Sequence, residues 1–510
     1  MTANLTRRSF LTASALAMPM VRRAWAGCAA PSLRIRVARN FASFDPIEAR
    51  GDDAIIAQNI LAPLVRYKKR VSDDDQWQWQ KHLAASIDAV DLRTYSFALR
   101  NENWADKTAI TAEDVKFSFE RTAGHANDPA FARNRDLWRK LDRVEIKDAS
   151  SALIHLKDDD PDLILDTLPT VAGCIVNRAY VAALPQGKFA LDPGRTSGRY
   201  RICELRTNDS VLLEKESLWH GDPVQIPAAE FVVIADDEAA QAAWKAGRID
   251  VYQPRRDVLN QVQSMATIDS GRAVRTPTSR TVYLALASEA GPLQRPELRR
   301  AVQLGIDTRA VAEEAYGSAE TSLATGLVPR GWSGWRKEPS YGFRFDEASR
   351  LALQARQPGQ PLGIVSLPDP VLVRAAGAIA GQLAKMAIEA RVAPPTPLPQ
   401  ASLMLRNGAV DIGVFSSPAA EFGPHNVFGR FFSQTPIAFY RSSQYDALYL
   451  ESQTRSERGA VFERLNNILV EDGAVAPLFE DHTIWWIRNG VTPAFGPDGG
   501  IADLGDWARG

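Results

Sequence analysis

The stretch from Tyr95 to Arg121 constrains the fold of this 510-residue chain more than any other. Apolar and polar or small residues alternate over Tyr95–Leu99, with the two-residue period of a half-buried strand. Asp106–Lys107 predicts a turn, and Thr111 is placed to cap a following helix with Asp114 as the acidic partner three residues on. Apolar residues four apart give that helix one buried face. The segment therefore predicts a strand, a turn and a capped helix, a unit of an α/β fold.

The first 26 residues have the features of an export signal. Thr6–Leu11 contains the paired arginines of a twin-arginine signal, and an apolar run too short to span a bilayer follows it. Ala24–Ala26 matches a small-residue cleavage site. We therefore expect export of the folded chain by the twin-arginine translocase into the periplasm. Cleavage before Cys28, which would give a lipoprotein, is the less favoured alternative because Trp25 stands where such a site prefers leucine.

Charge and cysteine content exclude several classes of protein. Residues 1–26 contain four arginines and no acidic residue, so removing them takes the formal net charge from −1 to −5. That balance argues against a nucleic-acid surface. The three cysteines are too few to hold a fold of this size together, although Cys174 and Cys203 could pair if they meet in space.

Sequence motifs for catalysis or cofactors are absent. The chain contains no G-x-S-x-G, H-E-x-x-H, P-loop or G-x-G-x-x-G motif, and its six histidines are scattered. The acidic triplets Asp73–Asp75 and Asp158–Asp160 lack the spacing of a calcium loop and predict solvated turns. We therefore expect no cofactor, no metal and no catalytic residue. A hydrolase whose catalytic residues meet only in space remains the alternative.

The order of several motifs resembles the family 5 extracellular solute-binding proteins. The segment W-A-D-K-T-A-I-T-A-E-D-V-K-F-S-F-E-R at 104–121 matches the signature turn and helix of that family, with Lys107 in place of the usual glycine. The segments A-W-K-A-G-R-I-D-V at 243–251 and L-R-R-A-V-Q-L-G-I-D-T-R-A-V at 298–311 match later motifs in the same order. Gly198 and Tyr200 match another, in which Arg199 replaces proline.

The resemblance implies an α/β periplasmic-binding-protein-like fold of the large cluster C type. Two lobes would be joined by crossing strands, with an extra α/β subdomain inserted in the first lobe. The implied boundaries are 27–60, 190–285 and 476–510 for lobe I, 61–189 for the inserted subdomain and 286–475 for lobe II.

The resemblance also implies a periplasmic receptor that captures a small solute and delivers it to the permease of an ABC importer. A peptide-like solute, a metal chelate and an opine-like or sugar-derived solute are all open. A monomer without enzymatic activity is expected. The alternatives are a receptor that serves a sensor or chemoreceptor, and a secreted hydrolase on the same scaffold.

Loop residues at strand ends are the predicted ligand contacts. Aligning Gly423–Asn426 on the family pattern puts Ala420 where peptide-binding members carry an aspartate for the ligand ammonium. Since an ammonium without a carboxylate is costly to bury, a conventional free-N-terminus peptide is disfavoured unless Glu421 replaces that aspartate. The predicted contacts are Arg39, Phe41 and Ser43 from lobe I, Ser416, Ser417, Glu421, His425 and Asn426 from lobe II, and Trp485 or Trp486 near a crossing strand.

Overall fold

The structure is a computed structural model that describes residues 22–24, 27–70, 72, 75–124, 134–185, 189–256, 270–317, 321–355, 361–419, 423–455 and 457–510. Most of the predicted signal, residues 1–21, 25 and 26, lies outside the described residues. Its described part is β1 (Arg22–Ala24), which pairs with β9 (Tyr200–Arg206) at the edge of a sheet. The export signal stays a prediction.

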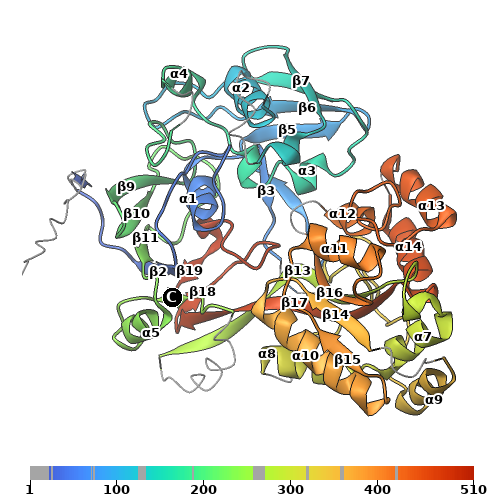
Figure 1. Ribbon diagram of the computed structural model, residues 1–510. Coiled ribbons are helices and arrows are strands. Elements are labelled where there is room, and N and C mark those ends of the chain that lie inside the picture. Colours follow the sequence, from blue (N-terminus) through green and yellow to red (C-terminus); the bar gives the residue numbers. More distant parts are fainter. Residues whose placement is uncertain are drawn as a thin grey trace, which may run out of the picture.

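One mixed sheet of eleven strands runs through the molecule (Figure 1). The strand order is β1-β9-β10-β11-β2-β12-β17-β13-β16-β14-β15. Besides β1 and β9, its strands are β2 (Leu33–Val37), β10 (Ser210–Lys215), β11 (Ala228–Val233), β12 (Val251–Tyr252), β13 (Gly271–Leu286), β14 (Leu362–Ser366), β15 (Ala390–Val392), β16 (Ile412–Pro418) and β17 (Val475–Arg488). The strands up to β12 belong to lobe I, and β16, β14 and β15 belong to lobe II.

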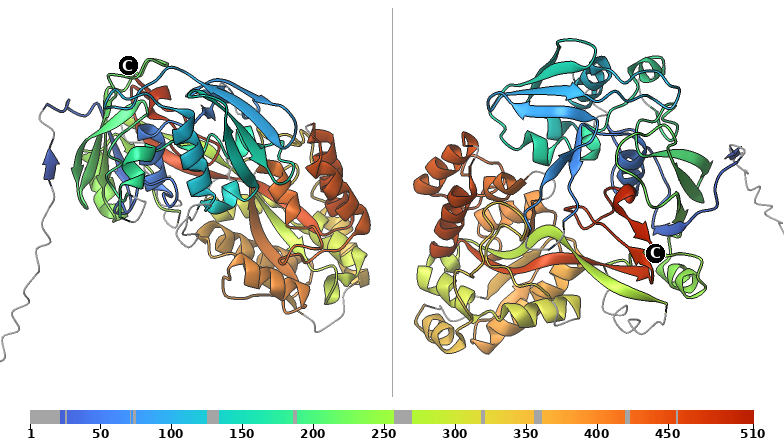
Figure 2. Two further views of the ribbon diagram at one scale, coloured as in Figure 1. Left: turned by 90° about the horizontal axis from the view of Figure 1, so that it is seen from above. Right: turned by 180° about the vertical axis from the view of Figure 1, so that it is seen from behind.

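The long strands β13 and β17 join the two lobes. Gly271–Pro277 pairs with His482–Arg488 beside β12, and Thr281–Ala285 pairs with Val475–Glu480 beside β16. The register shifts between these two parts, and Ser279 in the gap has a left-handed backbone with φ 50°. Seen from behind, both strands run from lobe II into lobe I (Figure 2, right). The expected crossing strands are therefore present, with an irregular segment at the crossing.

The inserted subdomain has its own sheet and core. The sheet order is β5-β6-β8-β7, with β5 (Ala84–Ala89), β6 (Thr94–Leu99), β7 (Leu141–Ile146) and β8 (Ser151–Leu156). Helix α2 (Ala112–Thr122) covers this sheet, and α3 (Leu163–Asp166) packs Leu163 into the same core (Figure 1). Helix α4 (Arg178–Ala182) lies beside α2 and buries Val181 in the lobe I core. The antiparallel pair β3 (Val65–Tyr67) and β4 (Trp79–Lys81) connects the subdomain to lobe I.

The signature stretch folds as its sequence predicts. Alternate residues of β6 are buried, and the Thr111 amide donates to the Asp114 carboxylate at 3.0 Å at the start of α2. Lys107, in the position of the family glycine, carries the left-handed backbone itself with φ 70°. Lys107 is exposed in this turn.

Lobe II packs helices on both faces of its part of the sheet. One apolar core lies under α7 (Pro296–Gly305), α8 (Thr308–Tyr316), α9 (Phe345–Ala355) and α10 (Pro370–Lys385). A second core lies under α11 (Leu398–Arg406), α12 (Gly423–Gly429), α13 (Ser443–Gln453) and α14 (Gly459–Glu471). Within the described residues, no helix has the length and apolar character needed to cross a bilayer.

Lobe I packs α1 (Asp52–Ile60), α5 (Asp237–Lys245) and the C-terminal segment around its part of the sheet, with β18 (Val491–Thr492) paired to β19 (Ala508–Arg509). A disulfide joins Cys28 to Cys203. Cys174 is a buried free thiol. Pairing of Cys174 with Cys203 is therefore wrong, because Cys203 on β9 faces the N-terminal segment. The same disulfide occupies the Cys28 thiol that a lipid anchor would need.

Candidate functional site

The crossing of the two lobes is built on a buried charge cluster. Asp481 on β17 accepts hydrogen bonds from Arg256 at 2.8 Å, from Thr278 at 3.0 Å and from the Tyr316 hydroxyl. Arg256 also pairs with Asp369, the residue that caps α10, at 3.0 Å. Burial opposes ionisation of Asp481, but Arg256 and Tyr316 outweigh it and hold the pKa of this carboxyl below its usual range. The crossing therefore pairs its buried carboxylate with one cation and two hydroxyl donors.

The inserted subdomain also touches lobe II directly, far from the crossing strands in sequence. The Trp77 amide donates to the carbonyl oxygen of Gly331 at 2.7 Å. The Trp77 ring lies under the Arg70 guanidinium, 4.6 Å from the ring centre, and packs into the lobe II core beside Trp332. Trp77 thus bridges the two parts of the molecule.

A second contact between the same two parts is polar. His425 of α12 lies with its Nδ1 atom 3.1 Å from the Asp162 carboxylate and 3.9 Å from that of Asp166, at the two ends of α3. Arg458, just before α14, pairs with the same Asp162 carboxylate. Figure 1 shows α3 and α12 next to each other. Two side chains of lobe II therefore meet two carboxyls of the subdomain.

The environment of this contact changes the protonation of its members. Burial raises the pKa of Asp166 well above its usual range. Burial also lowers the pKa of His425 to about 4 and that of Arg458 to about 10. Neither carboxylate oxygen of Asp166 has a hydrogen-bond partner among the described residues. The contact is therefore less well compensated than the cluster at the crossing.

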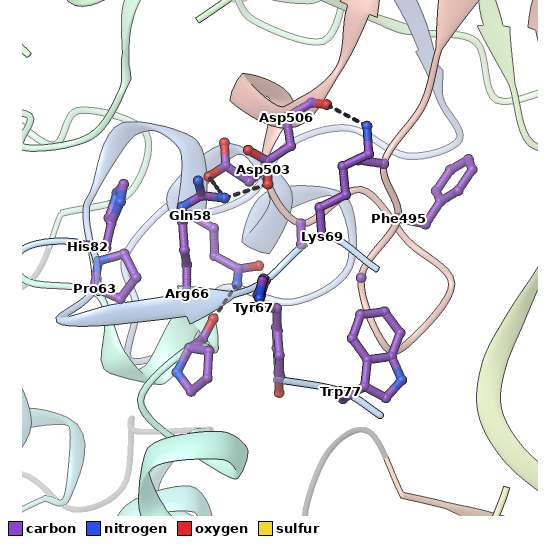
Figure 3. Close-up of a pocket in the computed structure, with 15 residues that line it drawn as sticks. Gln58, Pro63, Arg66, Tyr67, Lys69, Trp77, His82, Phe495, Asp503 and Asp506 are labelled. Atoms are coloured by element: carbon purple, nitrogen blue, oxygen red, sulfur yellow. Dashed lines mark hydrogen bonds and ion pairs between the residues drawn. The ribbon is translucent and has the colours of Figure 1, made fainter. Parts of the chain in front are cut away.

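A pocket lies between α1, β3 and the C-terminal segment of lobe I (Figure 3). Its lining includes the cations Arg66, Lys68 and Lys69 and the aromatic residues Tyr67, Trp77 and Phe495. Since Trp77 also packs into lobe II, the pocket lies beside the contact between the lobes. With a volume of about 30 Å³, however, the pocket is far smaller than the roughly 300–1,000 Å³ of sites that hold an organic ligand.

The charges of this pocket are largely paired with one another. Arg66 binds Asp506, lies 3.4 Å from Asp503 and pairs with Asp222 at 3.1 Å. From the other side, Arg199 contacts Asp503 at 3.0 Å and Asp506 at 3.1 Å. Two arginines thus hold the C-terminal segment against lobe I. They position the pocket wall, and their ion pairs leave little charge to bind a solute.

The predicted contacts from lobe I lie around the start of α1. The amides of Ala42 and Ser43 donate to the Asp53 carboxylate at 3.2 Å. Phe41 is buried and packs edge-on against Phe44, with ring centres 5.6 Å apart. Arg39 is exposed. The three residues therefore share one segment, and of their side chains that of Arg39 is open to solvent.

The predicted contacts from lobe II lie at the end of β16 and in α12. Ser416 is half-buried, and Ser417 is fully buried with a hydroxyl group that has no partner among the described residues. His425 is engaged with Asp162, and Asn426 beside it is half-buried. Glu421 and Ala420 lie outside the described residues. Strand and helix therefore place Ser416, His425 and Asn426 at one end of lobe II.

The tryptophans of β17 are packed within lobe I. Trp485 stacks on Phe495 with ring centres 5.4 Å apart, and its indole nitrogen donates to Gly499 at 2.8 Å. Trp486 points to the opposite face of the sheet and packs against Trp244. Trp485 therefore lies behind Phe495, which lines the pocket in Figure 3.

Sequence reasoning missed the subdomain side of the contact. Trp77, Asp162 and Asp166 were not predicted to touch lobe II. The available signal was the spacing of Asp162 and Asp166, four residues apart directly after Pro161, which can bring both carboxyls to one side of a helical turn. Their partner His425 is 263 residues away from Asp162 along the chain, so no local pattern pairs them.

Comparisons with known proteins agree with this architecture. The family model described as bacterial extracellular solute-binding proteins, family 5, middle region, matches residues 78–439. The periplasmic murein peptide-binding protein MppA of Escherichia coli K12 is 26% identical over 340 residues, which cover 62% of this chain and 59% of MppA. The probable D,D-dipeptide-binding periplasmic protein DdpA of the same organism is 23% identical over 436 residues, which cover 82% of each chain.

Solved structures share the fold. The unliganded open form of MppA aligns with a TM-score of 0.76 at 19% identity and covers 94% of this chain and 97% of that chain. NikA from Brucella suis in complex with Fe(III)-EDTA aligns with a TM-score of 0.76 at 17% identity, with coverage of 94% and 99%. With the family model matching well over half of its residues, this chain belongs to the bacterial extracellular solute-binding proteins of family 5.

Proposed function

We propose that the protein captures a small solute between its lobes in the periplasm and delivers it to the permease of an ABC importer. One observation carries the proposal: two bodies joined by the crossing strands β13 and β17 also touch through Trp77 and His425. A hinge plus a separate non-covalent contact allows the bodies to open and close around a solute. Export through a twin-arginine signal and a monomeric state are parts of the same proposal.

The lobes in this proposal are 27–60, 190–285 and 476–510 for lobe I with 61–189 as its inserted subdomain, and 286–475 for lobe II. We propose that the segment of Arg39, Phe41 and Ser43 lies on the first lobe's side of the solute, with the exposed Arg39 side chain as the direct contact and the buried Phe41 and Ser43 fixing its position. Ser416, Ser417, Glu421, His425 and Asn426 face the solute from the second lobe, with Trp485 as support behind Phe495. Ser416 and Asn426 have half-buried side chains that a solute could cover.

A peptide-like solute is the first class to test, because MppA and DdpA are named for murein peptide and D,D-dipeptide binding. Metal chelates and opines follow, since structures in this fold are titled as complexes with Fe(III)-EDTA and agropinic acid. The protein would do no chemistry of its own. A receptor for a sensor would bind in the same way, whereas a hydrolase would convert its ligand.

A thermal-shift and calorimetry panel of murein tripeptide, D-Ala-D-Ala, short L-peptides, metal chelates and opines tests the proposal. A true solute at one hundred times its Kd should add about 2.7 kcal/mol to the free energy of unfolding. Ser416→Trp should abolish that gain, and Ser443→Trp at the start of α13 is the matched control. Turnover of a compound, or no stabilisation by any class, would contradict the proposal.

A further inference from the structure

Three metal-ligating side chains converge where the inserted subdomain meets lobe II. Asp162 and Asp166 come from the two ends of α3, and His425 comes from α12. One donor atom from each lies within 4.8 Å of the other two. The group is therefore assembled from two parts of the molecule that approach each other only when the lobes are together.

The spacing of these donors fits a small transition-metal ion. Nitrogen and carboxylate ligands bind Zn²⁺ at about 2.0–2.2 Å, so two ligands of a tetrahedral site lie roughly 3.4 Å apart. The Nδ1 atom of His425 is 3.1 Å from Asp162 and 3.9 Å from Asp166, which brackets that spacing. Imidazole and carboxylate are both ligands of Zn²⁺, and a site with three protein ligands leaves the fourth position open to water or to another ligand.

The burial of Asp166 is an independent observation that points to a ligand. Its side chain is 5% exposed, and neither of its oxygen atoms has a hydrogen-bond partner in the described part of the chain. A buried carboxyl without a partner is costly unless a cation compensates it. A metal ion between Asp166 and His425 would remove that cost.

Gly423 allows lobe II to reach this carboxyl. A Cβ atom at Gly423 would lie 2.1 Å from Oδ2 of Asp166, and the backbone there has φ +68°. Any other residue would push the carboxyl away from His425. A cavity lined by Asp136, Lys140 and Asp160 opens onto Asp166 and His425 and gives an ion a route of entry.

We propose that Asp162, Asp166 and His425 bind a divalent transition-metal ion of the Zn²⁺ type that bridges the inserted subdomain and lobe II. The ion is held by side chains of the protein, and His425 is the residue that this site shares with the proposed solute contacts. Because its ligands come from both sides of the contact, bound metal favours the closed arrangement of the lobes. Arg458 shares the Asp162 carboxylate and therefore competes with the ion.

The test uses the full mature chain without a histidine tag, freed of metal with EDTA and titrated calorimetrically with ZnCl₂. We expect one Zn²⁺ per chain and a rise in the midpoint of thermal unfolding. Asp166→Asn and His425→Gln should each weaken binding by at least about tenfold. Arg458→Gln should tighten it, because the competing cation is lost. Ca²⁺, which needs six to eight oxygen ligands, should not bind.

Two matched controls separate this site from other surface groups. Asp136→Asn changes a carboxyl of the same cavity that is not among the three ligands, and His220→Gln changes an exposed histidine that pairs with Glu102. Both should bind Zn²⁺ as the unmodified protein does. Co²⁺ bound to the unmodified protein should show the visible absorption of a nitrogen- and oxygen-ligated site, and His425→Gln should remove it.

Several results would overturn the proposal. It is wrong if the unmodified protein takes up no Zn²⁺, or if Asp166→Asn and His425→Gln bind as tightly as Asp136→Asn. Should Asp166→Asn not fold, His425→Gln and the Co²⁺ spectrum decide the question alone. Loss of solute binding with Zn²⁺ binding intact would count only against the proposed function, so the two failures can be told apart.

Discussion

The lobes meet at two charged clusters, each with a buried aspartate whose pKa is shifted in the opposite direction from that of the other. At the crossing of β13 and β17, Asp481 accepts from Arg256, Thr278 and Tyr316, and its pKa lies below the usual range. At the contact of α3 with α12, Asp166 has no hydrogen-bond partner among the described residues, and burial raises its pKa well above the usual range. The first cluster gives its buried aspartate three donors, whereas in the second the Asp166 carboxyl accepts no hydrogen bond from the described residues although Arg458 pairs with the neighbouring Asp162.

The difference in pairing agrees with the roles of the two contacts when the lobes open and close. The crossing strands stay together in any arrangement of the lobes, so their buried charges can be paired permanently. The contact between α3 and α12 must separate if the lobes open. Strong permanent pairing there would hold the protein closed, because a ligand can shift such an equilibrium only by its differential affinity for the two states. With the metal site proposed above, the population of the closed state would instead depend on the bound ion.

The largest expected effect is at the crossing. Asp481→Ala should lower the free energy of unfolding by about 3–5 kcal/mol, because the half-buried Arg256 loses one of its two carboxylates and the buried hydroxyls of Thr278 and Tyr316 lose their acceptor. Chemical denaturation at pH 7 without added metal measures this. Asp209→Ala, an exposed carboxyl on the turn before β10, is the control and should change little. If Asp481→Ala and Asp166→Ala lower the free energy of unfolding by the same amount, the two clusters do not differ in how well they stabilise their buried aspartates.

Acid should weaken both clusters through their histidines. Burial lowers the pKa of His425 and of His482 to about 4. Between about pH 6.5 and pH 4 the unfolded chain binds a proton at each histidine and the folded chain does not, so stability falls as the pH falls. Each histidine should contribute a loss on the order of 3 kcal/mol over that range.

Denaturation midpoints measured from pH 7 to pH 4 check this prediction. His425→Gln and His482→Gln should each flatten the curve, and His220→Gln, an exposed histidine, should leave it unchanged. A curve that stays level in the unmodified protein between these pH values would show that neither imidazole is kept neutral by the fold.

The comparison also separates the parts of the structure that local sequence predicts from those that it does not. The strand and helix of 94–122 follow from residues within a few positions of one another, and they form as predicted. Lys107 shows that even the unusual backbone of the family turn survives without its glycine. Local patterns of this kind predict the units of an α/β fold, and the resemblance to the family added the two lobes and the crossing strands.

Contacts between segments that are distant in the sequence could not be predicted from these local patterns. The replacement of a family proline by Arg199 was visible in the sequence, but its partners Asp503 and Asp506 lie more than 300 residues away. The same holds for Cys28 with Cys203, 175 residues apart, and for Asp162 with His425. Periodicity reports which face of an element is buried, and it carries no information on which distant side chain meets that face.

Replacing the Asp166 carboxyl should give a moderate increase in the free energy of unfolding. Asp166→Asn should raise the free energy of unfolding of the metal-free protein by roughly 1–2 kcal/mol at pH 7, because the folded state no longer has to keep this acid protonated. The raised pKa means that the gain should shrink as the pH falls toward about 4, where the unfolded chain also protonates the acid.

Paired denaturation of Asp166→Asn and the unmodified protein at pH 7 and pH 4.5, with EDTA present, measures this gain. Asp136→Asn serves as the control in the same cavity. A loss of stability at pH 7 without metal would mean that neighbouring groups already stabilise the Asp166 carboxyl in the folded state. Asp166 would then resemble Asp481 in this respect.

The smallest effect is expected at Trp77, the apolar half of the contact between the subdomain and lobe II. Its indole nitrogen is buried without a hydrogen-bond partner among the described residues, while its ring lies under Arg70. Trp77→Phe keeps an aromatic face for the guanidinium and removes the unpaired N–H group, so two small effects oppose each other. The free energy of unfolding should change by less than about 1 kcal/mol, with Trp79→Phe on β4 as control. A loss of several kcal/mol would instead mean that the ring packing of Trp77, rather than a bound ion or solute, holds the subdomain against lobe II.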